Sequence, residues 1–131
     1  MKTLALFVAI FGIMAFASID AAAQKPTRIT FAKGSSEKVV SGTMTGYGSK
    51  RVFVIKVKAG QTLTTESVGD NYITIDIKAP KGSTYTPDLE ANCNDRHEVT
   101  PTAAGDYIIT VTECRKADPW RGAFRFKITV N

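Results

Sequence analysis

The segment from Arg115 to Arg121 carries the residues best suited to binding chemistry. It holds two arginines, Lys116 and the only tryptophan of the chain, Trp120. Tryptophan and arginine are favoured anchors of protein interfaces, and arginine also forms charge-assisted hydrogen bonds to carboxylates. A basic aromatic loop on a rigid scaffold is therefore a candidate binding element. The alternative is that Trp120 packs back over the end of the fold while the basic side chains stay in solvent.

Catalytic chemistry has little support in the sequence. His97 is the only histidine, and no serine lies in a nucleophile-elbow motif. The acidic residues are scattered through turns without a marked pair for glycoside hydrolysis. The sequence therefore predicts a protein that is not an enzyme, with His97 as a surface residue of a strand.

Four oxygen-bearing side chains alternate along one stretch, as the ligands of a calcium loop do: Asp88, Glu90, Asn92 and Asn94. A loop of the EF-hand type also needs glycine at its sixth position and glutamate at its twelfth, where this chain has Cys93 and Val99. The sequence therefore predicts no metal site and no cofactor.

The two cysteines of the chain, Cys93 and Cys114, form an even pair. In an oxidising compartment such a pair predicts a disulfide. Pro101 to Gly105 has the composition of a hairpin turn, and a turn centred between Ala103 and Ala104 would place the two cysteines directly opposite each other, within disulfide reach.

The oxidising compartment is indicated by the N-terminus. Lys2 is followed by an uncharged apolar or small run from Leu4 to Phe16, and then by Ala21-Ala22-Ala23. This pattern is typical of a cleavable secretory signal, and the run is shorter than the ~20 residues of a membrane-spanning helix. We expect a signal peptide at residues 1–23, a single domain at residues 24–131 and a periplasmic or secreted protein, with no stable membrane insertion. A retained N-terminal anchor is the alternative.

Charge restricts the partners only weakly. The net charge of +5 is spread along the chain without a run of like-charged residues. A solvated basic surface is the simplest interpretation, and acidic partners are compatible with it. No aromatic-basic recognition motif is present, so the sequence predicts no nucleic-acid binding.

Eight short stretches alternate apolar and polar residues and would position these groups. They are broken by glycine and proline, as in antiparallel sheets that face water on one side. The expected strands are Arg28–Ala32, Lys38–Met44, Arg51–Lys58, Thr62–Val68, Tyr72–Lys78, Arg96–Thr100, Asp106–Cys114 and Ala123–Val130. The fold class is all-β, an antiparallel sandwich of the jelly-roll kind. A five- or six-stranded barrel is the alternative.

Several short motifs resemble the periplasmic inhibitors of g-type (goose-type) lysozyme: Gly46-Tyr47, Gly60-Gln61, Pro101, Gly105-Asp106-Tyr107 and the closing aromatic strand. The resemblance runs from about Arg28 to the C-terminus and implies a β-sandwich that blocks a lysozyme cleft with protruding loops. Gly60-Gln61, Pro80-x-Gly82 and the Pro101–Tyr107 stretch equally resemble the pre-peptidase C-terminal-like domains, which are β-sandwiches attached to secreted enzymes.

Two features of the inhibitor family would carry the activity. Its Ser-Gly-x-Tyr turn falls on residues 104–107, where Gly105 and Tyr107 match and Ala104 replaces the serine. Its Thr-Arg pair falls on residues 114–115, where Arg115 matches and Cys114 replaces the threonine. Pro119 stands where the family has a second basic residue, although Arg121 is close.

The leading hypothesis is an exported lysozyme inhibitor that occludes the cleft of a lysozyme, most plausibly g-type. Its binding residues would be Gly105, Tyr107, Arg115, Trp120 and Arg121. The alternatives are a carbohydrate- or cell-surface-binding sandwich with Trp120 as a stacking platform, in which case cell-wall glycan is the partner, and a structural envelope protein.

Overall fold

The structure is a computed structural model that describes residues 25–46, 48–87, 93, 96–114 and 120–131. The expected signal at residues 1–23 lies outside the described residues, as do Arg115, Lys116 and Pro119. The four side chains considered for calcium also lie outside them: Asp88, Glu90, Asn92 and Asn94. Within the described ranges, no helix has the length and apolar character that crossing a membrane requires.

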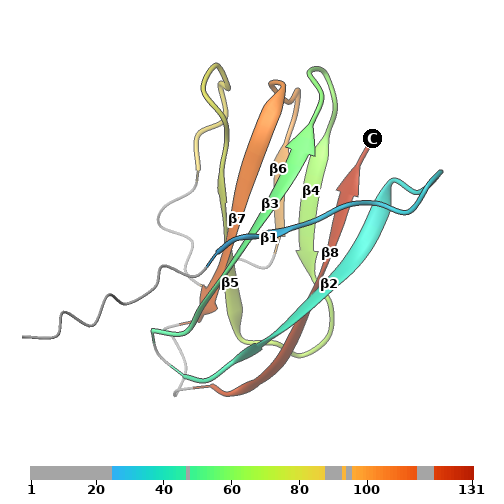
Figure 1. Cartoon of the computed structure of the whole chain (residues 1–131). Coiled ribbons are helices and arrows are strands. Elements are labelled where there is room, and N and C mark those ends of the chain that lie inside the picture. The colour runs from blue at the N-terminus through green and yellow to red at the C-terminus, as the bar shows by residue number, and fades with distance from the viewer. Residues whose placement is uncertain (1–24, 47, 88–92, 94–95, 115–119) are drawn as a thin grey trace, which may run out of the picture.

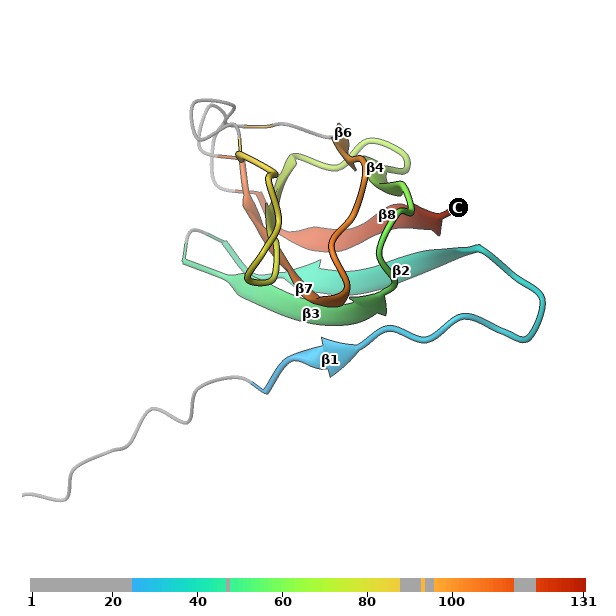
Figure 2. The ribbon, with the colours of Figure 1, turned by 90° about the horizontal axis from the view of Figure 1, so that it is seen from above.

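The described residues form eight strands in two sheets. The strands are β1 (Thr27–Arg28), β2 (Glu37–Met44), β3 (Lys50–Val57), β4 (Leu63–Ser67), β5 (Ile73–Lys78), β6 (Arg96–Val99), β7 (Gly105–Glu113) and β8 (Gly122–Val130). One sheet has the order β1-β3-β7-β5 and the other has the order β2-β8-β4-β6 (Figure 1). Seen from above, the two sheets stack as layers (Figure 2). The all-β sandwich expected from the sequence is confirmed.

The core lies between the sheets and is built by period-2 alternation. Side chains of a strand alternate between its two faces, so each strand contributes every second residue to the interior. The inner faces expected for β3, β5, β7 and β8 are confirmed, because their buried residues include Phe53, Ile55, Val57, Ile73, Ile75, Ile77, Tyr107, Ile109, Val111, Phe124, Phe126, Ile128 and Val130. The ring of Phe53 joins the layers through edge contacts with Phe126 at 5.5 Å and Phe124 at 6.4 Å between centroids.

The expected hairpin between β6 and β7 is wrong. β6 pairs with β4, whereas β7 pairs with β3 and β5 in the opposite sheet. The connection crosses between the sheets and is held on the β3–β4 turn, where Gly60 N donates to Thr102 O and Thr102 N donates to Gln61 O, both at 2.8 Å. Alternation shows which face of a strand is buried, but it does not identify the strand that supplies its hydrogen bonds.

Two smaller expectations also differ from the structure. The strand expected at Arg28–Ala32 is reduced to Thr27–Arg28, which pairs in parallel with Phe53 and Val54 of β3. His97 was expected at the surface but is 7% exposed, because it shares the inner face of β6 with Val99. Its Nδ1 lies 3.5 Å from the hydroxyl of Tyr85.

Candidate functional site

The predicted site residues on either side of β7 lie at opposite ends of the sandwich. β7 begins at Gly105 and ends at Glu113 (Figure 1), and the backbone N–H of Trp120 is hydrogen-bonded to Glu113 at that second end. The eight steps from Gly105 to Glu113, at about 3.3 Å each, span about 26 Å. We call these the Gly105 end and the Trp120 end.

At the Gly105 end, the two matched family residues have structural roles. Gly105 has a φ of 141°, and a Cβ there would lie 2.8 Å from the Cβ of Pro80, so only glycine fits without strain. Tyr107 is 0% exposed, and its ring lies in the core. Its hydroxyl accepts a hydrogen bond from Ala103 N at 3.0 Å and donates to Ala103 O at 3.2 Å. A side chain buried in this way has no surface to offer a partner.

Asp106, between these two residues, is exposed and paired with Arg28. Two guanidinium nitrogens of Arg28 lie 3.2 Å from the two carboxylate oxygens of Asp106. Hydrogen bonding to Arg28 lowers the pKa of the Asp106 carboxyl below its ordinary value, and the same contact raises the pKa of Arg28. The pair ties β1 to the start of β7 and leaves this arginine engaged within the chain.

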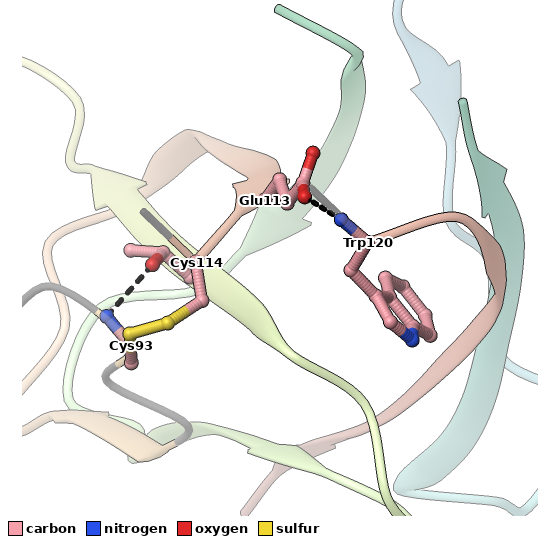
Figure 3. Close-up of a disulfide and its surroundings, with 5 residues drawn as sticks. Cys93, Glu113, Cys114 and Trp120 are labelled. Atoms are coloured by element: carbon pink, nitrogen blue, oxygen red, sulfur yellow. Dashed lines mark hydrogen bonds between the residues drawn. A yellow bond between two sulfur atoms is a disulfide. The ribbon is translucent and has the colours of Figure 1, made fainter. Parts of the chain in front are cut away.

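At the Trp120 end, a buried carboxylate holds the start of β8. Glu113 lies on the inner face of β7 and is 4% exposed. One of its carboxylate oxygens accepts a hydrogen bond from the backbone N–H of Trp120 (Figure 3). Its Oε2 is buried and has no hydrogen-bond partner among the residues that the structure describes. Glu113 therefore fixes the backbone of Trp120 at the end of β7.

The indole of Trp120 packs over the end of the sandwich. It is half-buried against the core, and a Cβ on Gly122 would lie 3.2 Å from the ring. Part of the indole ring therefore packs over the fold, as in the alternative interpretation of the sequence, and the rest stays exposed. The indole also makes an edge contact with Tyr72, with centroids 6.5 Å apart and planes at 68°.

The Cys93–Cys114 disulfide expected from the sequence is present, with a Cα–Cα distance of 4.8 Å. It does not arise from the hairpin register, since β6 and β7 lie in different sheets. Hydrogen bonds hold the backbone of both cysteines at β5. Cys93 N donates to the side-chain Oγ1 of Thr74 at 2.8 Å (Figure 3). Cys114 N donates to the carbonyl of Tyr72, the residue before β5, also at 2.8 Å. The cross-link therefore stiffens the Trp120 end.

Arg121 is the described basic residue directly beside Trp120. It is exposed, and its Nε lies 3.6 Å from where a Cβ on Gly46 would stand, so the β2–β3 connection runs next to it. Of the five predicted binding residues, Trp120 and Arg121 come together at this end, whereas Gly105 and Tyr107 lie at the other end. Arg115 lies outside the described residues.

Sequence reasoning missed two residues of this end. Glu113 could have been found from the sequence. It lies two residues beyond Val111, so it faces the core on the same side of β7 as Tyr107, Ile109 and Val111, and it is the acidic residue among them. Tyr72, which is 55% exposed, precedes β5 in one sheet while Trp120 precedes β8 in the other. Their proximity has no local signal in the sequence.

The fold is similar to that of solved periplasmic inhibitors of g-type lysozyme. The inhibitor from Aeromonas hydrophila has a TM-score of 0.64 and 23% identity, covering 81% of this chain and 96% of its own. The Salmonella Typhimurium inhibitor has a TM-score of 0.61 and 18% identity, covering 83% of this chain and 100% of its own. The pre-peptidase C-terminal domain of a Bacillus anthracis collagenase is more distant, at a TM-score of 0.49 and 13% identity over 83% of this chain and 97% of its own. No protein-family model and no curated protein matches the chain.

Proposed function

We propose that this chain is an exported inhibitor of lysozyme, with a g-type enzyme as its first target, and that it binds with its Trp120 end. The observation that carries the proposal is the placement of Trp120 and Arg121 side by side on a cross-linked end of a rigid sandwich. The shared fold with inhibitors of g-type lysozyme supports the proposal. Export and a periplasmic or secreted location rest on the signal expected at residues 1–23.

The proposed mechanism is occlusion of the cleft. Glycoside hydrolases generally carry a pair of carboxyl groups beside the scissile bond. A guanidinium can form charge-assisted hydrogen bonds with such a group, and the interaction strengthens when water is excluded. Arg121 would supply this cation, and the exposed part of the Trp120 indole would cover the apolar wall of the cleft. No step requires a cofactor or catalysis by this chain.

Arg115 adds a second cation to the proposal. It follows Cys114 directly, so its backbone starts from a residue fixed by the disulfide and by a hydrogen bond to Tyr72 O. Gly105 and Tyr107, which the family resemblance assigns to binding, are given a different role here. They hold the turn at the far end of the sandwich and do not enter the same cleft.

The decisive experiment is an inhibition titration of the mature protein against g-, c- and i-type lysozymes. We expect Arg121→Ala or Arg115→Ala to weaken inhibition of the susceptible enzyme by ~2–5 kcal/mol if the contact is buried. The matched control is Arg28→Ala, which removes an arginine from the Gly105 end and should leave the inhibition constant unchanged. Equal losses for Arg28→Ala and Arg121→Ala would reject the assignment of the Trp120 end.

The runner-up function is a carbohydrate-binding sandwich, and the contact between Tyr72 and Trp120 favours it because aromatic rings can stack on sugars. A peptidoglycan pull-down beside the titration separates the two functions. Glycan binding without inhibition of any lysozyme would support the runner-up, and inhibition without glycan binding would support the proposal.

A further inference from the structure

We infer that Tyr72 is a further partner-contacting residue and the aromatic anchor of the Trp120 end. The inference rests on the proposed function, and it names a contact residue on the β4–β5 turn, a segment that neither the sequence motifs nor the family resemblance assigns to binding. The partner that it fits is a cleft with apolar walls and carboxylates, such as the sugar-binding cleft of a lysozyme.

The first observation is the exposure of Tyr72. Among the described residues, two large hydrophobic side chains are markedly exposed: Tyr72 at 55% and Val39 at 51%. Val39 lies within β2, directly opposite Lys127 of β8. Tyr72 lies in edge contact with Trp120, so exposed and half-buried aromatic surface is continuous there. Exposed apolar side chains that cluster indicate an interaction site, whereas single exposed ones are common on any protein surface.

The second observation is that the backbone of Tyr72 is fixed although its ring is exposed. Its carbonyl accepts a hydrogen bond from Cys114 N at 2.8 Å, beside the disulfide. On its other side, Asn71 Nδ2 donates to Val68 O at 2.9 Å and to Arg125 O at 3.0 Å. Binding by a side chain on a fixed backbone loses less conformational entropy than binding by a mobile loop.

The third observation is the chemistry of the surroundings. A tyrosine offers a flat apolar ring with a polar tip, and it has only two side-chain torsions to restrict. The cationic neighbour is Arg121, which is exposed and follows Trp120 directly. A cleft that binds sugar rings beside catalytic carboxylates has apolar surface for such a ring and acidic groups for such a cation. The three side chains have the composition of an interface hot spot.

The test compares three variants of the mature protein against the lysozyme that the wild type inhibits. We expect Tyr72→Ala to raise the inhibition constant at least tenfold, in the range of a hot-spot truncation. Tyr72→Phe, which keeps the ring and its contact with Trp120, should change it by less than about threefold. Val39→Ala is the matched control, because it trims the other exposed large hydrophobic side chain, and it should leave inhibition unchanged.

A second measurement separates contact from a purely structural effect on Trp120. Nitration of tyrosines in the free wild type and in its complex, followed by peptide mapping, reports whether Tyr72 is covered. We expect Tyr72 to be modified readily in the free protein and to be protected at least tenfold in the complex. Equal modification in both states overturns the inference, even if Tyr72→Ala weakens inhibition.

The remaining outcomes distinguish this inference from the proposed function. A wild type that inhibits lysozyme while Tyr72→Ala inhibits equally well overturns the inference alone. A wild type that inhibits none of the three lysozyme types overturns both. Loss of peptidoglycan binding in Tyr72→Ala, with lysozyme inhibition intact, overturns it in favour of a sugar as the occupant.

Discussion

Tyr107 can be tested as a structural residue by removing its hydroxyl group. In Tyr107→Phe, the buried ring is kept and the hydroxyl is lost. That hydroxyl makes two hydrogen bonds with the backbone of Ala103, at 3.0 and 3.2 Å. Because Tyr107 is 0% exposed and lies at the end away from Trp120, we expect the variant to lose stability and to keep the lysozyme inhibition that we propose for the wild type.

The size of the loss follows from the two contacts. A hydrogen bond contributes a net ~0.5–1.5 kcal/mol, so the two together contribute about 1–3 kcal/mol. For a domain of about 100 residues, each kcal/mol lowers the melting temperature by about 4 °C, which gives a decrease of about 4–12 °C. The remaining ring still fills the core, so the loss should stay below that of Tyr107→Ala, which also leaves a cavity.

The assay is thermal unfolding followed by circular dichroism, paired with the lysozyme inhibition constant measured well below the melting temperature of the variant. A melting temperature equal to that of the wild type, together with a weaker inhibition constant, would refute the reasoning. It would mean that the hydroxyl acts on a partner and not on Ala103.

Two other predictions concern the cross-link and the exposed ion pair. The double variant Cys93→Ser/Cys114→Ser should lose about 3 kcal/mol of stability in urea unfolding, as expected for opening a loop of this size; an unchanged urea midpoint would contradict it. Because Arg28 lowers the pKa of Asp106, the stabilisation by this pair is present at neutral pH and is lost as pH falls through that lowered pKa. Asp106→Asn should therefore have a lower melting temperature than the wild type at neutral pH, and the difference should shrink as acid protonates the Asp106 carboxyl of the wild type; a difference that persists unchanged in acid would argue against the pair.

The inner faces of the strands could be predicted from the sequence because side-chain direction along a strand is a local property. Phe53, Ile55 and Val57 are buried for the same reason that their alternation is visible in the sequence. The disulfide could be predicted from the even pair of cysteines and the expected compartment. The placement of β6 and β7 could not, because both strands face the core, and alternation is the same whether they pair in one sheet or lie in two.

The candidate site divides in the same way. The sequence alone determined the strand expected at Asp106–Cys114, because alternation is a local signal, and an extended strand separates its two termini. The leading hypothesis put Gly105 and Trp120 in one binding surface, whereas the structure places Gly105 at the start of β7 and Trp120 beside Glu113 at its end. Only the tertiary structure brought Tyr72 to Trp120, because Tyr72 precedes β5 of one sheet and Trp120 precedes β8 of the other. That contact depends on how the two sheets stack and on the disulfide beside it, and side-chain packing between sheets is set by the whole core rather than by either segment.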